Sequence, residues 1–188
     1  MSELDSNDSP SVATQPASSS NRTNRYVLFF TLAAAGCAID LATKSYMFDW
    51  LGGPGEGGVH WLIEGIFGFE TALNRGALFG MGQGMVWLFA LMSFLALGGI
   101  VWWLVRFRAI DDWLLTFTLG LVCGGVLGNL YDRLGIWSGY EVYAVRDWIR
   151  VSYQGHVWPN FNIADSLLVC GAALLIWHSF RYTEPATS

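Results

Sequence analysis

Four aspartates lie at or beside the ends of long apolar stretches, in the company of amide and cationic side chains. The full set is Asp40, Asp132, Asp147, Asp165, Asn74, Asn129, Asn162, Lys44 and Arg133. An ionised carboxylate at the centre of a bilayer costs about 2.5–3.5 kcal/mol on insertion scales. Helix capping and mutual pairing could explain any one of these residues, but their gathering at one membrane face predicts a functional site.

Two neighbouring aspartates can carry out one particular chemistry. Carboxyl groups in close proximity cannot both ionise cheaply, so one pKa rises and the pair shares a proton. Such a pair can hold a water, remove its proton and protonate a leaving amine. That chemistry is aspartic proteolysis, which uses neither a metal nor a nucleophilic side chain.

Competing chemistries have few residues to support them. The three histidines are scattered with no HExxH motif, and no serine lies in a GxSxG turn. The three cysteines each lie in an apolar stretch with no CxxC pair, which disfavours disulfides and a zinc site. We therefore expect no metal and no cofactor.

The composition limits which elements can position these residues. Of the 188 residues, 53% are hydrophobic and only 13% are charged. A soluble domain has about 25% charged residues, and a disordered chain is poor in aromatic residues, so both classes are excluded. The net charge of −5, without a long basic run, gives no support for nucleic-acid binding.

Four apolar segments approach the length of about 20 residues that a membrane-spanning helix needs: 26–48, 86–105, 113–130 and 163–182. The first is long enough only if its helix continues through Asp40 and Lys44, which then share one helical face. Tryptophans at both ends of the second segment are typical of membrane interfaces. Glycines in the third would permit close helix packing.

Four spans place both termini on one side of the membrane. The long connections, at about 49–83 and 131–161, share the opposite side and contain short aromatic, β-branched pieces that predict a small sheet. Lysines and arginines divide equally between the two sides, but those beside helix ends favour cytoplasmic termini. Residues 1–24 are predicted to be a disordered tail, 25–182 the membrane-embedded domain, and 183–188 a short C-terminal tail.

Five short motifs occur in order along the chain: DLATK (40–44), NRGALFG (74–80), GNLYDR (128–133), VRDWI (145–149) and FNIADS (161–166). Together with the four spans, they resemble the lipoprotein signal peptidase family, also called signal peptidase II. The resemblance covers about residues 25–182. It implies an all-α membrane protein, with four transmembrane helices and a small extracytoplasmic β-sheet that cradles the substrate.

The resemblance also implies an activity, that of a membrane-embedded aspartic endopeptidase of the cell inner membrane. Such hydrolases cleave the signal peptide from prolipoproteins just before a diacylglyceryl-modified cysteine. The implied catalytic pair is Asp147 and Asp165. The implied partners are these prolipoproteins and membrane lipids, and we expect a monomer with cytoplasmic termini and an active site near the extracytoplasmic face.

The remaining polar residues receive supporting roles from the same resemblance. Some would bind the substrate or position the aspartates: Asn74, Asn129, Asn162 and Arg133. Others would be structural, with Asp40 and Lys44 ordering the end of the first helix and Asp132 pairing with Arg133.

The chain departs from the family pattern in places that raise one rival residue. Leu78 stands where a small residue is usual, Trp148 replaces phenylalanine, and the stretch between Asp132 and Asp147 is long. That insertion makes Glu141 a rival to Asp147 for the role of first catalytic acid. The apolar neighbours of Asp147 favour Asp147 over Glu141.

Two alternative functions stay open on the sequence alone. One is a non-enzymatic carrier or assembly factor whose polar cluster conducts protons or ions. The other is a haem or quinone site lined by the many tryptophans, which the interfacial placement of these residues disfavours.

Overall fold

The computed structural model describes residues 19–76, 82–139 and 141–181. Four long helices dominate it: α1 (Ser19–Leu51), α2 (Val86–Arg106), α3 (Trp113–Arg133) and α4 (Ile163–Arg181). All four are long and apolar enough to cross a membrane. The prediction of four transmembrane helices is therefore confirmed, with boundaries that differ by a few residues at the helix ends.

Helix α1 begins earlier than predicted, so residues 19–24 are helical although the sequence assigned them to a tail. Ion pairing explains the difference. The Arg22 guanidinium lies 2.8 Å from the Asp111 carboxylate, and Arg25 donates to the backbone carbonyls of Ile110 and Asp111. The rest of the predicted tails, residues 1–18 and 182–188, lies outside the described residues.

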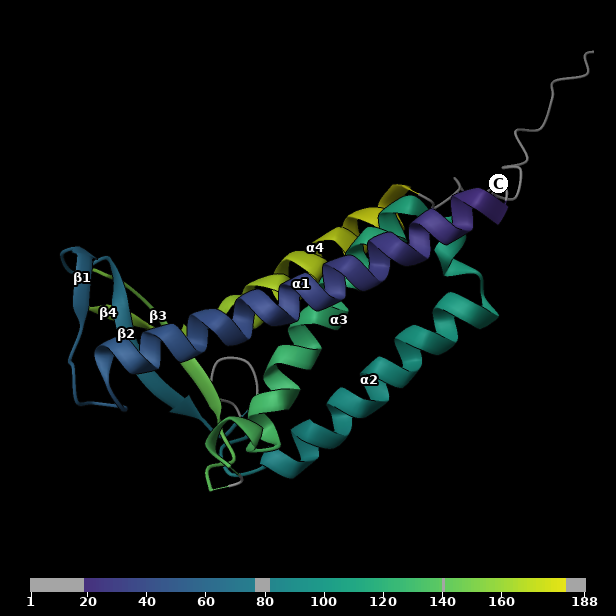
Figure 1. The fold of residues 1–188 in the computed structure, drawn as a ribbon. Helices are drawn as coiled ribbons and strands as arrows, with labels where there is room; N and C mark the ends of the chain where they lie inside the picture. The colour runs from purple at the N-terminus through teal and green to yellow at the C-terminus, as the bar shows by residue number, and fades with distance from the viewer. Residues whose placement is uncertain (1–18, 77–81, 140, 182–188) are drawn as a thin grey trace, which may run out of the picture.

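Both described ends of the chain lie at the same end of the helical bundle (Figure 1). The start of α1 contacts the short 3-10 turn η2 (Ala109–Asp111), which joins α2 to α3. Near the end of α4, His178 Nε2 lies 2.9 Å from Asp112 Oδ2 beside the same turn. This arrangement is the one that four consecutive spans require.

Helix α3 packs closely against both α1 and α4 because it presents glycines to them. A Cβ atom on Gly124 would lie 3.0 Å from the Ala33 carbonyl oxygen of α1, and one on Gly125 would lie 2.7 Å from the Ala164 carbonyl oxygen of α4. Small residues at such crossings let helix backbones approach each other. The expected close packing at these glycines is confirmed, and it draws three helices together beneath the site described below.

The two long connections form one antiparallel sheet at the opposite end of the bundle from the described termini (Figure 1). Its strands, in spatial order, are β1 (His60–Ile63), β2 (Phe67–Asn74), β3 (Val145–Tyr153) and β4 (His156–Phe161). The predicted small sheet is confirmed. The 3-10 turn η3 (Ile136–Ser138) lies between α3 and β3 in the chain, and β3 contacts both α1 and α3.

Candidate active site

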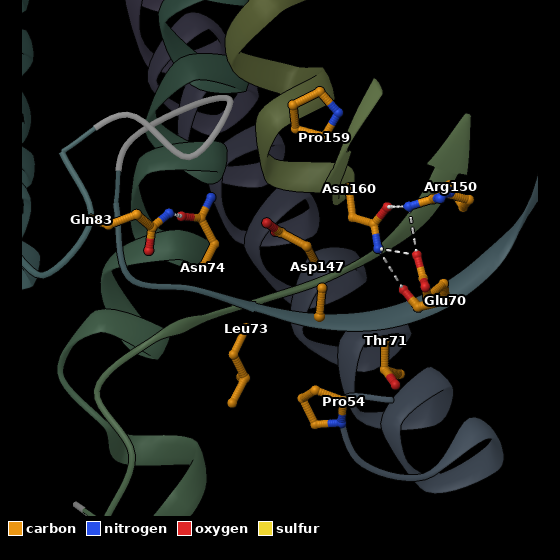
Figure 2. Close-up of a pocket in the computed structure, with 11 residues that line it drawn as sticks. Pro54, Glu70, Thr71, Leu73, Asn74, Gln83, Asp147, Arg150, Pro159 and Asn160 are labelled. Atoms are coloured by element: carbon orange, nitrogen blue, oxygen red, sulfur yellow. Dashed lines mark hydrogen bonds and ion pairs between the residues drawn. The ribbon is translucent and has the colours of Figure 1, made fainter. Parts of the chain in front are cut away.

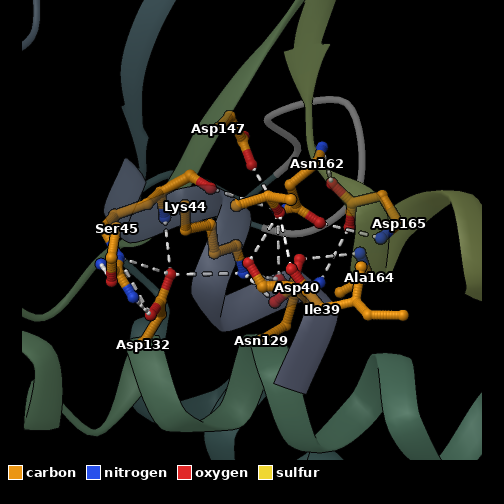
Figure 3. Close-up of polar contacts among 12 residues, drawn as sticks. Ile39, Asp40, Lys44, Ser45, Asn129, Asp132, Asp147, Asn162, Ala164 and Asp165 are labelled. Carbon is orange, nitrogen blue, oxygen red and sulfur yellow. Dashed lines mark hydrogen bonds and ion pairs between the residues drawn. The ribbon is translucent and has the colours of Figure 1, made fainter. Parts of the chain in front are cut away.

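Asp147 and Asp165 come from different elements and meet at a single asparagine. Asp147 lies on β3, Asp165 lies in the first turn of α4, and both side chains are buried. Asn162 Nδ2 donates to Asp147 Oδ1 at 2.7 Å, and the Asn162 backbone N–H donates to Asp165 Oδ2 at 3.3 Å (Figure 3). One residue therefore holds both carboxyl groups of the predicted pair.

The start of α4 is fixed by reciprocal hydrogen bonds. Asn162 Oδ1 accepts from the Asp165 backbone N–H at 2.9 Å, while Asp165 accepts from the Asn162 backbone N–H. This exchange has the form of a capping box, which satisfies backbone donors at a helix start. Asp40 Oδ1 accepts from a further free amide, that of Ala164, at 2.9 Å. The aspartate in the first turn of α4 is thus held by the helix start itself.

Asn129 connects Asp165 to a buried cation. Its Nδ2 donates to Asp165 Oδ1 at 2.8 Å, and its Oδ1 accepts from Lys44 Nζ at 2.9 Å and from Asn162 Nδ2 at 3.2 Å. Because an ammonium group can only donate, Lys44 fixes which end of the Asn129 amide faces Asp165. Three helices and the segment before α4 meet in this network.

A layer of paired charges lies beneath the network, fully or almost fully buried. Lys44 Nζ lies 2.6 Å from Asp40 Oδ2 and 3.3 Å from Asp132 Oδ2. Arg146 Nη2 lies 2.8 Å from Asp132 Oδ1, so two cations balance two carboxylates. These contacts join the end of α1 to α3 and β3, and the ordering role of Asp40 and Lys44 there stays a prediction.

The predicted pairing of Asp132 with Arg133 is wrong, because Asp132 pairs with Arg146 instead. Adjacent helix residues point in different directions, so Asp132 and Arg133 cannot share a face. Arg133 donates from Nη2 to the Gly76 carbonyl at 3.4 Å, and its guanidinium lies over the Phe89 ring. Sequence reasoning missed Arg146, whose one signal was a charge inside the apolar strand segment that carries Asp147.

The environment of Asp147 favours its protonated form. Burial is the first cause that raises its pKa well above the ordinary aspartate value, and the neighbouring Asp165 carboxylate adds to it. The Lys44 charge and hydrogen bonds from Asn162 and Asn74 lower the pKa without cancelling the shift. Two carboxyl groups in such surroundings favour a state in which they share one proton.

Asp147 also borders an open pocket of about 370 Å³ on the sheet (Figure 2). Asn74 lines the same pocket, and its Oδ1 accepts from the Gly76 backbone N–H at 2.9 Å. A molecule in this pocket would therefore reach one of the two acidic groups directly. The described residues include no group of three or more histidine, cysteine or acidic side chains arranged to hold a metal ion.

The rival Glu141 lies in a different environment. Its side chain is exposed in the loop before β3, whereas Asp147 is only 2% exposed. Trp148, another departure from the family pattern, is buried, and its ring lies edge-on to Phe69 with centroids 5.5 Å apart. Leu78 lies outside the described residues.

Comparisons with known proteins were made with the sequence and with the fold. The family model for signal peptidase (SPase) II matches residues 32–181. A lipoprotein signal peptidase of Rhodopirellula baltica is 52% identical over 164 residues, which are 84% of this chain and 73% of the relative. One of Geobacillus thermodenitrificans is 35% identical over 161 residues, or 86% and 94% of the two chains. A solved bacterial membrane enzyme with 23% identity has the same fold, with a TM-score of 0.71 over 85% of this chain and 93% of its own.

Proposed function

This chain belongs to the signal peptidase II family, and we propose that it is an aspartic endopeptidase with Asp147 and Asp165 as its catalytic pair. Its proposed substrates are prolipoproteins, cleaved just before a diacylglyceryl-modified cysteine. The observation that carries the proposal is that Asn162 bonds both carboxyl groups, one from the sheet and one from a helix start. Acidic groups so held can share one proton and one water.

The proposed division of labour follows from the surroundings of each carboxyl. Asp165 accepts hydrogen bonds from Asn129 and Asn162 on its two oxygens, which suits the ionised member of the pair. Asp147, with its raised pKa, suits the protonated member. Asp165 would take a proton from water as the water oxygen bonds to the peptide carbonyl carbon, and Asp147 would give its proton to the carbonyl oxygen.

Breakdown of the resulting gem-diol completes the reaction. The carbon–nitrogen bond breaks as Asp165 returns its proton to the leaving amine, and the diol returns the other proton to Asp147. The products are a carboxylic acid and the free amino group of the lipid-modified cysteine. Both acidic groups end in their starting protonation states, so the cycle needs no further reactant.

The position of the pair suits a substrate that is anchored by lipid. Asp165 lies in the first turn of a span and Asp147 lies in the adjoining sheet, which places the pair at the end of the apolar bundle. Each acyl CH₂ that is buried in a membrane contributes about 0.8 kcal/mol. A diacylglyceryl group would therefore hold its cysteine at this depth, beside the acidic groups.

The test is cleavage of a synthetic prolipopeptide by the full-length protein in detergent micelles. We expect cleavage at the bond before the lipid-modified cysteine, and at least about 100-fold weaker cleavage of the same peptide without lipid, because the acyl chains supply anchoring. We also propose that a monomer acts, in which case the rate per enzyme molecule should not depend on enzyme concentration. Failure to cleave the lipidated peptide, or cleavage at another bond, would overturn the proposal.

We further propose that both termini are cytoplasmic and that the sheet is extracytoplasmic. At the end that carries the termini, Arg106, Arg108 and Arg181 are exposed. At the other end Lys44 and Arg146 are buried in ion pairs, and of the described basic residues there only Arg75 is exposed. Basic residues that flank spans remain on the cytoplasmic side. A C-terminal green fluorescent protein fusion should fluoresce and a phosphatase fusion should be inactive, and the reverse pair of results would overturn this orientation.

A further inference from the structure

A second polar cluster lies on the sheet beside Asp147 and takes no part in the network around Asn162. It consists of Glu70, Arg150 and Asn160, one from each of three neighbouring strands. Arg150 Nη1 and Asn160 Nδ2 both lie 2.9 Å from Glu70 Oε2, and Arg150 Nη1 lies 3.4 Å from Asn160 Oδ1 (Figure 2). Asn160 Nδ2 also donates to the Glu70 backbone carbonyl at 3.2 Å.

Two irregularities of the sheet place these side chains. Between the pairs Phe69–Ile149 and Ala72–Asp147, strand β2 has two residues opposite a single residue of β3, and one of the two is Glu70. Between the pairs Ile149–Phe161 and Val151–Trp158, β4 has two residues, Pro159 and Asn160, opposite Arg150. Bulges of this kind re-aim side chains and are common next to active sites.

The cluster and the proposed catalytic group border one cavity. Glu70, Arg150 and Asn160 line the same pocket of about 370 Å³ as Asp147 and Asn74. The side chains of Glu70 and Arg150 remain 27% and 21% exposed, so their polar groups are accessible from this pocket. A polypeptide whose carbonyl lies at Asp147 would therefore place its neighbouring residues against the cluster.

The guanidinium of Arg150 is not saturated by the fold. Its hydrogen bonds to Glu70 and Asn160 both use Nη1, and its buried Nε has no partner among the described residues. Buried donors without partners cost free energy, and they are accordingly uncommon. The cluster as a whole offers donors and acceptors together, with the charges of one cation and one anion in balance.

The position of the cluster indicates which part of a substrate it meets. The acyl chains and the apolar part of a signal peptide belong in the membrane, whereas the sheet lies at the end of the bundle opposite the described termini. The chain that leaves the membrane is the segment after the modified cysteine. That segment would therefore pass over the sheet and the cluster.

We infer that Glu70, Arg150 and Asn160 form a specificity subsite for the first residue after the modified cysteine, and that this subsite favours an uncharged, hydrogen-bonding side chain such as serine or asparagine. The inference rests on the proposed function. An apolar side chain would offer no partner to the unused donors of Arg150, and sites built for hydrogen bonding reject such analogues. A charged side chain would be repelled by one member of the Glu70–Arg150 ion pair and would compete for the other.

The experiment compares prolipopeptides that differ only at this residue, which is serine, asparagine, leucine or glutamate. For the wild-type protein we expect kcat/KM to be about tenfold higher with serine than with leucine, a modest value because the subsite is partly exposed. In Glu70→Ala and Arg150→Met that ratio should fall towards one. Glu64→Ala removes the same type of side chain from the exposed β1–β2 turn and should keep the wild-type ratio.

The ratio distinguishes selectivity from a structural role. A purely structural cluster would lower kcat/KM for all four peptides by the same factor, and an unchanged ratio would overturn the inference. If Glu70→Ala fails to fold, as judged by size-exclusion elution, Asn160→Ala takes its place. This variant keeps the Glu70–Arg150 ion pair, and its ratio of kcat/KM for the serine and leucine peptides should also fall towards one. A wild-type enzyme that cleaves all four peptides equally would overturn the subsite alone, whereas one that cleaves none would overturn the proposed function and the subsite with it.

Discussion

Replacement of Asp147 or Asp165 by asparagine should lower kcat/KM for a diacylglyceryl prolipopeptide by roughly 10⁴-fold or more, the scale on which catalytic residues act. Asparagine keeps the size of aspartate and one oxygen acceptor, so the hydrogen bond from Asn162 to position 147 and the helix cap at position 165 can persist. What each variant loses is the ability to take up or release a proton. Cleavage is followed by mass spectrometry, and thermal melting checks that the fold is retained.

The matched control is Glu141→Gln, which makes the same kind of change at the rival acidic residue. Because Glu141 is exposed in the loop before β3, its loss should change kcat/KM by less than about twofold, as for a surface residue that touches no substrate. A result in which Glu141→Gln is inactive and Asp147→Asn is active would transfer the catalytic role to Glu141. Normal cleavage by Asp165→Asn would show that Asp147 and Asp165 do not act as a catalytic pair.

Much of the architecture could be predicted because it depends on local patterns. The apolar length of each span, the glycines of α3 and the spacing of Asp40 and Lys44 are all properties of short segments. The four-residue spacing places both charges on one helical face, and the structure pairs them at 2.6 Å. The FNIAD segment also carries a local signal, because asparagine followed three residues later by an acidic residue can form a capping box.

The features that could not be predicted depend on how distant segments meet. Asp132 pairs with Arg146 because β3 lies against α3. Helix geometry argues against the adjacent Arg133, but the sequence alone does not indicate which distant cation pairs with Asp132 instead. The cluster of Glu70, Arg150 and Asn160 depends on two bulges, and bulges leave no clear pattern in the sequence. Pairings between strands decide both arrangements, and neither follows from hydrophobic periodicity.

Replacement of Lys44 by methionine should destabilise the protein by about 3–5 kcal/mol, because it leaves a buried carboxylate without its counter-charge. Lys44 is fully buried between Asp40 and Asp132. After its loss Asp132 would keep Arg146, but Asp40 would have no cationic partner among the described residues. Thermal melting in detergent should show a midpoint about 10 °C lower. The variant should also cleave poorly, because Asn129 loses the donor that orients its amide towards Asp165.

The double variant Lys44→Met with Asp40→Asn separates these two effects. Asparagine at position 40 removes the unpaired charge but can still accept from the Ala164 backbone N–H, and the pair of Asp132 with Arg146 remains balanced. We therefore expect recovery of at least half of the lost stability without recovery of kcat, because Asn129 still lacks its donor. If the double variant melts as low as Lys44→Met, the unpaired charge is not the cause of instability. If it regains full activity, Lys44 has no positioning role through Asn129.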